Sequence, residues 1–324
     1  MKNVLVTGAG GFIGSHLAER LVELGFNVTG FIRYNSRNNW GWIEKSKYLK
    51  EIKIITGDVR DYDSVKNAMK GVDAVFHLAA LIGIPYSYVS PLAYIKTNVE
   101  GTYNILQAAL ELGIERVIHT STSEVYGTAQ FIPISENHPI NPQSPYAASK
   151  AAADFLALSY YSSFELPVIV LRPFNTYGPR QSARAVIPTI ITQILAGNRE
   201  IKLGNINSTR DFNYVADIVD AFIQISKCDN AIGEVINAGS GVEISIEELV
   251  RTIASLIGVE VKIIQEEQRI RPEKSEVMRL ICDNLQIKSL INWAPKYDLI
   301  SGLKITIEWI KENLAIYKYE LYNI

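Results

Sequence analysis

The feature that most constrains the fold is a short apolar run followed by a glycine turn, near the start of the chain. Val4–Thr7 is rich in β-branched residues, which predicts a buried strand. Three glycines follow with the spacing G-x-x-G-x-x-G, and residues 15–24 have leucines at helical spacing. A strand, a glycine turn and a helix in this order can bind a diphosphate, because the helix N-terminus directs free amide groups at the anion.

Glycine-rich turns are common in proteins, so the spacing by itself is a weak signal. The strand before the turn and the helix after it make a nucleotide site the better interpretation. We therefore expect a dinucleotide cofactor at this turn, on residues Gly8, Gly11, Phe12, Ile13 and Gly14.

Length and composition exclude several classes of function. The chain has 324 residues, of which 48% are hydrophobic, and a net charge of −2, so nothing favours binding to nucleic acid or to an anionic membrane. No apolar run has the length of a membrane-spanning helix, and the N-terminal run is too short for a signal peptide. Neither the two cysteines nor the four histidines have metal-ligand spacing. We expect a cytoplasmic protein with no metal, nucleic-acid or membrane partner.

Further short apolar runs predict a sheet built from alternating strands and helices. They lie at residues 27–32, 52–56, 74–78, 116–121 and 168–172. This alternation predicts an α/β fold with a doubly wound parallel sheet and a second, smaller mixed α/β substrate domain. We place the dinucleotide-binding domain at residues 1–173, with parts of 205–240 returning to it. Residues 174–324 then form mainly the substrate-binding domain.

The end of the second predicted strand bears on the choice of cofactor. An acidic residue there would bind the ribose 2′-hydroxyl of NAD, whereas an arginine favours the 2′-phosphate of NADP. This chain has Arg33, followed by Ser36 and Arg37, which favours NADP with NAD as the alternative. The same three residues could instead be solvated loop residues. Asp58, after the third strand, would contact the adenine or cap the next helix.

Two segments contain the candidate catalytic residues. Thr122, Ser123 and Glu124 follow the fifth strand, at the edge of the sheet where ligands bind in such folds. Tyr146 and Lys150 are four residues apart, on one face of a predicted helix. A neighbouring ammonium group and a nicotinium cation favour the phenolate, so Tyr146 could accept a proton from a hydroxyl group. Tyr-x-x-x-Lys is common by chance, but after the glycine turn it is a strong signal.

Together these motifs resemble the extended short-chain dehydrogenase/reductase family, and among its members the nucleotide-sugar epimerases and dehydratases. The resemblance covers essentially the whole chain and includes segments 171–179, 210–217 and 271–272. It implies a nucleotide-diphosphate sugar as substrate, with Asn175, Arg210 and Arg271 on its diphosphate and Asp217 as a structural partner. Two arginines suit a diphosphate, because each guanidinium matches phosphate oxygens. The further cofactor contacts that it implies are Asp58, Val59, Leu78, Ala79, Ala80 and Asn98.

Within this family, Thr122-Ser123-Glu124 resembles the 4,6-dehydratases of the GDP-mannose type. The segments 33–42 and 271–276 resemble the N-acetylhexosamine 4,6-dehydratases of legionaminic and pseudaminic acid synthesis. Arg33 departs from the acidic residue of NAD-dependent members, and Ser123 stands where glucose dehydratases have aspartate. We expect a 4,6-dehydratase of a UDP- or GDP-linked N-acetylhexosamine. The alternatives are a 4-epimerase of UDP-N-acetylglucosamine or UDP-glucose, and a non-enzymatic dinucleotide sensor, which would not need the catalytic residues.

The resemblance also implies a homodimer, formed by two long helices of each subunit at residues 91–112 and 144–163. The second of these helices is apolar on all sides, which favours close approach of another helix. The alternative is that the same residues are buried within one subunit. The residues expected at the interface are Tyr94, Val99, Tyr103, Leu106, Ala147, Ala148, Ala151, Ala152, Phe155, Leu156 and Leu158. Trp40 and Trp42, in a polar loop, would contact another subunit or fold back on their own chain.

Overall fold

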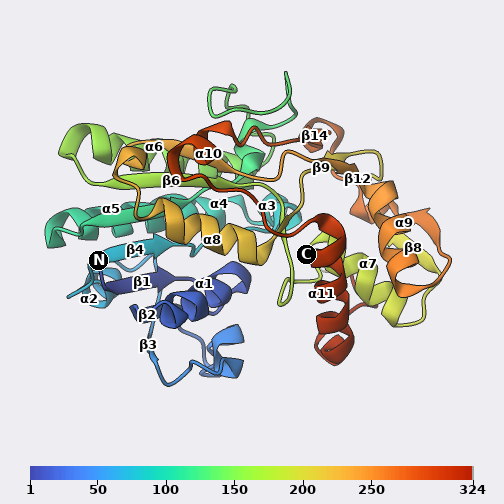
Figure 1. The fold of residues 1–324 in the computed structure, drawn as a ribbon, viewed down its shortest axis with the longest axis horizontal. Helices are drawn as coiled ribbons and strands as arrows, with labels where there is room; N and C mark the ends of the chain where they lie inside the picture. Colours follow the sequence, from blue (N-terminus) through green and yellow to red (C-terminus); the bar gives the residue numbers. More distant parts are fainter. Residues whose placement is uncertain (323–324) are drawn as a thin grey trace.

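A seven-stranded parallel sheet forms the centre of the protein (Figure 1). The structure, a computed structural model, describes residues 1–322. The strands lie in the order β11-β6-β5-β4-β1-β2-β3, and each neighbouring pair is parallel. Their bounds are β1 (Asn3–Thr7), β2 (Asn27–Arg33), β3 (Ile52–Gly57), β4 (Ala74–His77), β5 (Arg116–Thr120), β6 (Val168–Pro173) and β11 (Val235–Ala238). The predicted doubly wound parallel sheet is confirmed.

Helices cover both faces of this sheet, because successive side chains of each strand point to opposite faces. In β1, Val4 and Val6 pack into one core with α1 (Phe12–Glu23) and α8 (Val215–Ile225), while Leu5 packs into the other. That second core is formed with helices α2 (Tyr62–Ala68), α5 (Gly101–Leu112) and α6 (Pro145–Phe164). The strand β11 and the helix α8, from the second half of the sequence, both belong to this layered part. The domain division at residue 173 stays a prediction.

A smaller lobe lies at the right of Figure 1. Two short parallel strands, β8 and β13, pair there beside α7, α9 and α11. The bounds of these elements are α7 (Val186–Leu195), β8 (Glu200–Leu203), α9 (Ile246–Ile257), β13 (Lys262–Gln265) and α11 (Leu299–Glu312). The shorter elements are α3 (Ile84–Val89), β7 (Thr176–Tyr177), β9 (Thr209–Arg210), β10 (Asn213–Tyr214), β12 (Ile244–Ser245), β14 (Arg279–Leu280) and α10 (Leu285–Ile291).

The helical segment 91–112 is not one regular helix. It consists of α4 (Pro91–Tyr94), a π-helical turn over Ile95–Glu100, and α5. The π turn contains Asn98, which is buried. π turns of this kind are frequent at functional sites.

The surface corrects part of the predicted dimer interface. Tyr94 and Leu106 are buried in the core of their own subunit, and so are Ala147 and Ala151. Leu106 packs into the core between the sheet and its helices, and Tyr94 packs against Tyr146. All four side chains are buried within one subunit, so they are not available to a partner. A stripe on the outside of these helices stays exposed, and its members are Leu92, Ile95, Tyr103, Ala148, Ala152 and Phe155.

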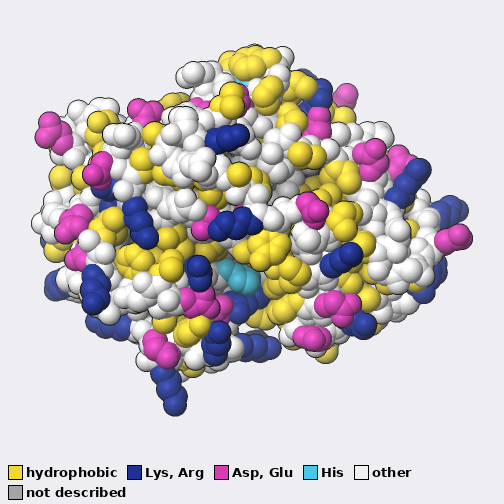
Figure 2. Space-filling model, in the orientation of Figure 1, with side chains coloured by type: hydrophobic (Ala, Val, Ile, Leu, Met, Phe, Trp, Pro, Cys, Tyr) yellow, Lys and Arg dark blue, Asp and Glu magenta, His cyan; other side chains and the backbone are white. Residues whose placement is uncertain are grey.

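The face of the molecule shown in Figure 2 has no strong charge bias. On the face shown in Figure 2, basic and acidic side chains are interspersed. Such mixing agrees with the small net charge of −2. Over residues 1–322, no helix combines the length and the apolar character that crossing a membrane requires.

Candidate active site

The glycine turn between β1 and α1 is packed so closely that side chains could not replace its hydrogens. A Cβ on Gly14 would lie 2.3 Å from the carbonyl oxygen of Gly8. Gly8 has a φ of +71°, and a Cβ there would lie 3.0 Å from the amide nitrogen of Ala79, in the loop after β4. No side chain caps the first turn of α1, so its amide groups remain free for an anion.

A cavity of about 800 Å³ opens beside this turn, at the carboxyl ends of the strands. Of the predicted cofactor residues, Ser36, Arg37 and Asn98 do not line it, and the others do. A smaller cavity of about 240 Å³ shares Glu124, Asn175 and Arg271 with the first. A dinucleotide fits these residues, because the close-packed turn has free amides and faces a cavity of sufficient size. The contacts themselves stay predictions.

Asn98 lies outside the cavity lining and holds two of the lining segments together by hydrogen bonds. Its side-chain amide donates to the carbonyl of Leu81 at 3.0 Å and to Ser149 Oγ at 2.9 Å. Its Oδ1 accepts a hydrogen bond from the amide of Leu81 at 2.8 Å. Asn98 therefore joins the loop after β4 to the helix of Tyr146 and Lys150.

Where the cavity meets the ends of β2 and β3, Arg33 and Asp58 both contribute to the lining. A hydrogen bond from Arg60 lowers the pKa of Asp58, and their ion pair measures 2.5 Å. Asp58 does not cap the next helix, since Asp61 does so by accepting from the amides of Asp63 and Ser64. The alternative prediction, that Asp58 caps this helix, is therefore wrong.

The tryptophan loop folds back on its own chain. The amide of Trp42 donates to the carbonyl of Gly10 at 2.9 Å, in the glycine turn. The ring of Trp42 packs edge-on against Trp309 of α11, with the centroids 5.4 Å apart. Trp40 lies against Gly10, where an added Cβ would be 2.4 Å from the Trp40 carbonyl oxygen. The loop thereby forms one wall of the cavity.

The candidate catalytic residues come from two adjoining elements. Thr122 follows β5, and its Oγ1 accepts a hydrogen bond of 3.2 Å from the amide of Glu124, which starts a 3₁₀ turn. Tyr146 and Lys150 lie in the first turns of α6, which Ser144 caps by accepting from the amide of Ala147 at 3.1 Å. These four candidates and Ser123 all line the larger cavity.

Burial shifts the proton equilibria of Tyr146 and Lys150. Burial raises the pKa of Tyr146 well above its usual value, with Glu124 acting in the same direction and a hydrogen bond with Thr122 in the opposite one. Burial lowers the pKa of Lys150 to about 8, although the charge of Asp154 acts to raise it. Without a further cation, Tyr146 therefore holds its proton and Lys150 titrates near neutral pH.

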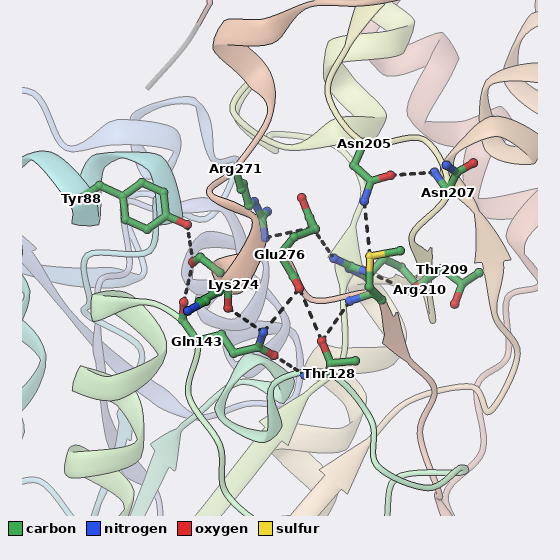
Figure 3. Close-up of polar contacts among 12 residues, drawn as sticks. Tyr88, Thr128, Gln143, Asn205, Asn207, Thr209, Arg210, Arg271, Lys274 and Glu276 are labelled. Atoms are coloured by element: carbon green, nitrogen blue, oxygen red, sulfur yellow. Dashed lines mark hydrogen bonds and ion pairs between the residues drawn. The ribbon is translucent and has the colours of Figure 1, made fainter.

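The two predicted phosphate arginines face a common carboxylate. Glu276 lies between Arg210 and Arg271 in Figure 3, at 3.6 Å from the first and 3.8 Å from the second. Arg210 is buried in β9, and this burial lowers its pKa. Asn175, which lines both cavities, has a buried Oδ1 without a hydrogen-bond partner in the described chain.

The segment 271–278 is fastened to the sheet-containing part by hydrogen bonds (Figure 3). Tyr88 bonds to Ser275 at 2.7 Å, and Gln143 donates to the carbonyl of Lys274 at 2.9 Å. Thr128 Oγ1 accepts from the amide of Met278 at 3.3 Å. These bonds hold the segment that contains Arg271 and Glu276, both of which line the smaller cavity.

Sequence reasoning missed Arg180, Arg184 and Glu276, which line the cavities. Arg180 directly follows Pro179, and its own φ is 72°. Its side chain donates to Ser15 at 3.1 Å and to Glu19 at 3.0 Å, both on α1. The adjoining motif Tyr177-Gly178-Pro179 indicated that this segment is functional, but it did not predict that the arginine after it contacts α1.

Comparison with known proteins identifies the family. A family model described as GDP-mannose 4,6 dehydratase matches residues 5–306. The chain is 37% identical to a UDP-N-acetyl-alpha-D-glucosaminuronate decarboxylase of Bacillus cytotoxicus, over 96% of this chain and 98% of that protein. It is 34% identical to a putative UDP-glucose 4-epimerase of Methanocaldococcus jannaschii, over 96% and 99%. The solved dTDP-glucose 4,6-dehydratase of Streptomyces venezuelae, with NAD bound, has a TM-score of 0.87 at 28% identity, over 98% and 99%.

These relatives share a fold and differ in the reactions that their names state. The predicted resemblance is therefore confirmed at the level of the family, while the dehydratase and epimerase alternatives stay open. From the match over residues 5–306 and the glycine turn, we conclude that this chain is an enzyme of the GDP-mannose 4,6-dehydratase-like family, among the NAD(P)-dependent nucleotide-sugar dehydratases and epimerases of the extended short-chain dehydrogenases/reductases.

Proposed function

We propose that this protein is a 4,6-dehydratase of a UDP- or GDP-linked N-acetylhexosamine, in the synthesis of a nonulosonic acid. The observation that carries the proposal is the place of Glu124. Its side chain is only 7% exposed, lines both cavities, and lies close enough to Tyr146 and Arg210 for its charge to act on both. A carboxylate between the catalytic tyrosine and a phosphate arginine suits proton removal at carbon 5 of the sugar, which a simple 4-epimerase does not need.

The first step is proton removal at carbon 4 of the sugar. Arg210 and Arg271 bind the diphosphate, and Asn175, which lines the same cavity, donates to it from its side-chain NH₂ group. Tyr146 accepts the hydroxyl proton, with Thr122 hydrogen-bonded to it and Lys150 one turn away. A bound nicotinamide dinucleotide would take up the hydride from carbon 4 and later return it to carbon 6.

The second step is loss of water from carbons 5 and 6. The 4-ketone acidifies the proton at carbon 5, and Glu124 removes it as a general base. Glu124 then hands this proton to the departing 6-hydroxyl group, so that one water leaves and a double bond forms between carbons 5 and 6. When the hydride returns to carbon 6, carbon 5 takes up a proton from solvent, and Tyr146 releases to solvent the proton that it accepted from the 4-hydroxyl group. Ser123 is a poorer source of the proton, because a neutral hydroxyl is a weak acid.

Mass spectrometry tests the proposed reaction directly. The protein is incubated with UDP-N-acetylglucosamine, GDP-N-acetylglucosamine and GDP-mannose, and we expect a product lighter by one water. A product of unchanged mass with inversion at carbon 4 would refute dehydration and favour the 4-epimerase. If the wild-type protein turns over none of these sugars, the sensor alternative is favoured. In that case Tyr146→Phe should behave like the wild type in the same assay.

We propose NADP as the cofactor, with NAD as the alternative. Arg33 supports NADP, since it ends β2, lines the cavity and forms no ion pair within the described chain. Ser36 and Arg37 lie outside the lining and do not add to this argument. Heating the purified protein releases its nucleotide for identification by chromatography. Recovery of NAD alone would refute the role of Arg33.

We also propose a homodimer, located in the cytoplasm. The exposed stripe on α4–α6 supports it, because apolar side chains in a row are rarely left to solvent. Phe155 is 58% exposed, whereas Leu156 is partly buried in its own subunit, so Phe155 is the better residue to change. We expect Phe155→Glu to give a folded monomer by light scattering. A wild-type monomer at micromolar concentration would refute the dimer.

A further inference from the structure

A buried aspartate lies on the same helix as the two catalytic residues. Asp154 is one turn after Lys150 and two turns after Tyr146 in α6, and it is 1% exposed. Its Oδ1 accepts a hydrogen bond from His119 at 3.2 Å. Its Oδ2 accepts from Ser121 at 2.6 Å and from the guanidinium of Arg172 at 3.0 Å. Both carboxylate oxygens are therefore occupied.

These contacts connect Asp154 to each element that holds a catalytic group. Ser121 directly precedes Thr122 at the end of β5. Arg172 also donates to the hydroxyl of Tyr126 at 2.9 Å, in the 3₁₀ turn that begins after Thr122. A carboxylate bound in this way keeps one position and one charge, because moving it would break hydrogen bonds to three residues, two at β5 and one in β6.

We propose that Asp154 is a positioning residue whose fixed negative charge sets the pH range in which Tyr146 and Lys150 exchange a proton with the substrate. This proposal depends on the proposed function in one respect only, that Tyr146 and Lys150 exchange a proton with the substrate. It is independent of whether the enzyme is a dehydratase or an epimerase, since both begin by removing the proton of the 4-hydroxyl group.

The other groups around Lys150 do not supply this charge. His77 of β4 and His119 of β5 face it and are neutral, because burial lowers the pKa of His119 to about 4 and that of His77 well below its usual value. Glu124 acts on Tyr146, but among the described residues Asp154 is the acid whose charge acts on both Tyr146 and Lys150.

Asp154 keeps its charge although it is buried. Burial acts to raise its pKa, but the hydrogen bond of His119 and the charge of Arg172 outweigh this and hold the pKa below its usual range. In turn, the charge of Asp154 raises the pKa of both Tyr146 and Lys150. Loss of this charge should therefore move both ionisations, and with them the whole activity range, to lower pH.

The test compares Asp154→Asn with Ser121→Ala in the protein with its bound cofactor. The first variant removes the charge, while the second removes one hydrogen bond and leaves the charge. We expect both limbs of the pH–rate profile to move down by roughly one pH unit in Asp154→Asn. Ser121→Ala should keep the wild-type limbs. A merely structural role would lower the rate at every pH without moving either limb, and that result would overturn the proposal.

A second readout does not depend on turnover. Acetic anhydride reacts with a lysine amine only in its neutral form. Lys150 lines the cavity, and peptide mass spectrometry measures how far Lys150 is acetylated at each pH. We expect the labelling midpoint to fall by the same amount in Asp154→Asn. An unchanged midpoint would overturn the proposal even if no sugar substrate is found. A shifted midpoint in a protein that proves to be an epimerase would refute the proposed function and support this inference.

Asp154→Asn leaves the guanidinium of Arg172 buried without its ion pair and could fail to fold. The double variant Asp154→Asn with Arg172→Met removes both buried charges together. Lys150 still loses its acidic neighbour in this variant, so the same downward shift in the labelling midpoint is expected. A folded double variant with the wild-type midpoint would contradict the proposal.

Discussion

Changing Glu124 to glutamine separates the two steps of the proposed reaction. The amide has the size of the carboxylate but cannot accept the proton at carbon 5. Removing a general base typically lowers a rate by about 10² to 10⁴, or about 3–5 kcal/mol of transition-state stabilisation. Because Glu124 is only 7% exposed, water cannot easily replace it, and we expect a loss near the upper end. Arg210 keeps Glu276 at 3.6 Å, so the substrate site should persist.

The assay follows three events in a single turnover with excess enzyme. Oxidation at carbon 4 appears as absorbance of the reduced nicotinamide, and exchange at carbon 5 appears as deuterium taken up from heavy water. Loss of water is measured by mass. In Glu124→Gln we expect the reduced cofactor to appear at the wild-type rate and then persist, because deuterium uptake and loss of water are both slow.

Two control variants bracket this result. Tyr146→Phe should abolish the absorbance change itself, since it removes the group that accepts the first proton. In Ser123→Ala, the substrate should lose water at close to the wild-type rate if Glu124 delivers the proton to the leaving group. Loss of water at the wild-type rate in Glu124→Gln would refute the role of Glu124. A defect confined to Ser123→Ala would assign the acid to Ser123 instead.

The strands of the sheet could be predicted from sequence because they are buried on both faces. Such strands appear as continuous apolar runs, and β1 to β6 each contain one. The strand β11 was not predicted, because Val235–Ala238 has only four residues and includes Asn237. Its place in the sheet depends on pairing with β6, which is distant in sequence and leaves no local signal.

Burial of the long helices could be predicted only in part. Apolar residues on all sides of 144–163 indicated contact with something on each side, but not which side faces the sheet. In 91–112, the π turn interrupts the regular helix directly after Tyr94, whose ring packs against Tyr146 with centroids 6.2 Å apart. Helical periodicity assumes a regular helix, so it could not place Tyr94 and Leu106 in the core.

The site shows the same division between local and distant information. Motifs such as Tyr146 with Lys150 are local, and the fold brings most of the predicted residues to the two adjoining cavities. Glu276 and Asp154 were not predicted, because an acidic residue acquires its role from the arginines that it meets after folding. Their partners, Arg210 and Arg172, come from other strands. Their roles stay predictions until the variants are measured.

The remaining predictions concern how the site is held together. Gly14→Ala would place a Cβ 2.3 Å from the Gly8 carbonyl oxygen, so we expect a protein without bound nucleotide; wild-type cofactor content would contradict the assignment of the turn. Arg271→Met should raise KM for the nucleotide sugar roughly ten- to hundredfold with a smaller change in kcat, as expected for loss of a charged hydrogen bond, and an unchanged KM would remove Arg271 from the phosphate site. The last prediction concerns Arg180, which ties the loop lining both cavities to Ser15 and Glu19 of α1. Arg180→Met loses both hydrogen bonds and leaves Glu19 unpaired, which should lower the free energy of unfolding by about 1–3 kcal/mol. Arg180→Gly loses the same bonds but relieves the left-handed backbone at a φ of 72°, which offsets about 1 kcal/mol of that loss. Denaturant unfolding of both variants should therefore give the order wild type, Gly, Met. If Arg180→Met unfolds at the wild-type midpoint, the arginine does not tie the loop to α1, and the strained backbone must be held by the neighbouring contact of His16 with the Pro179 carbonyl at 3.0 Å.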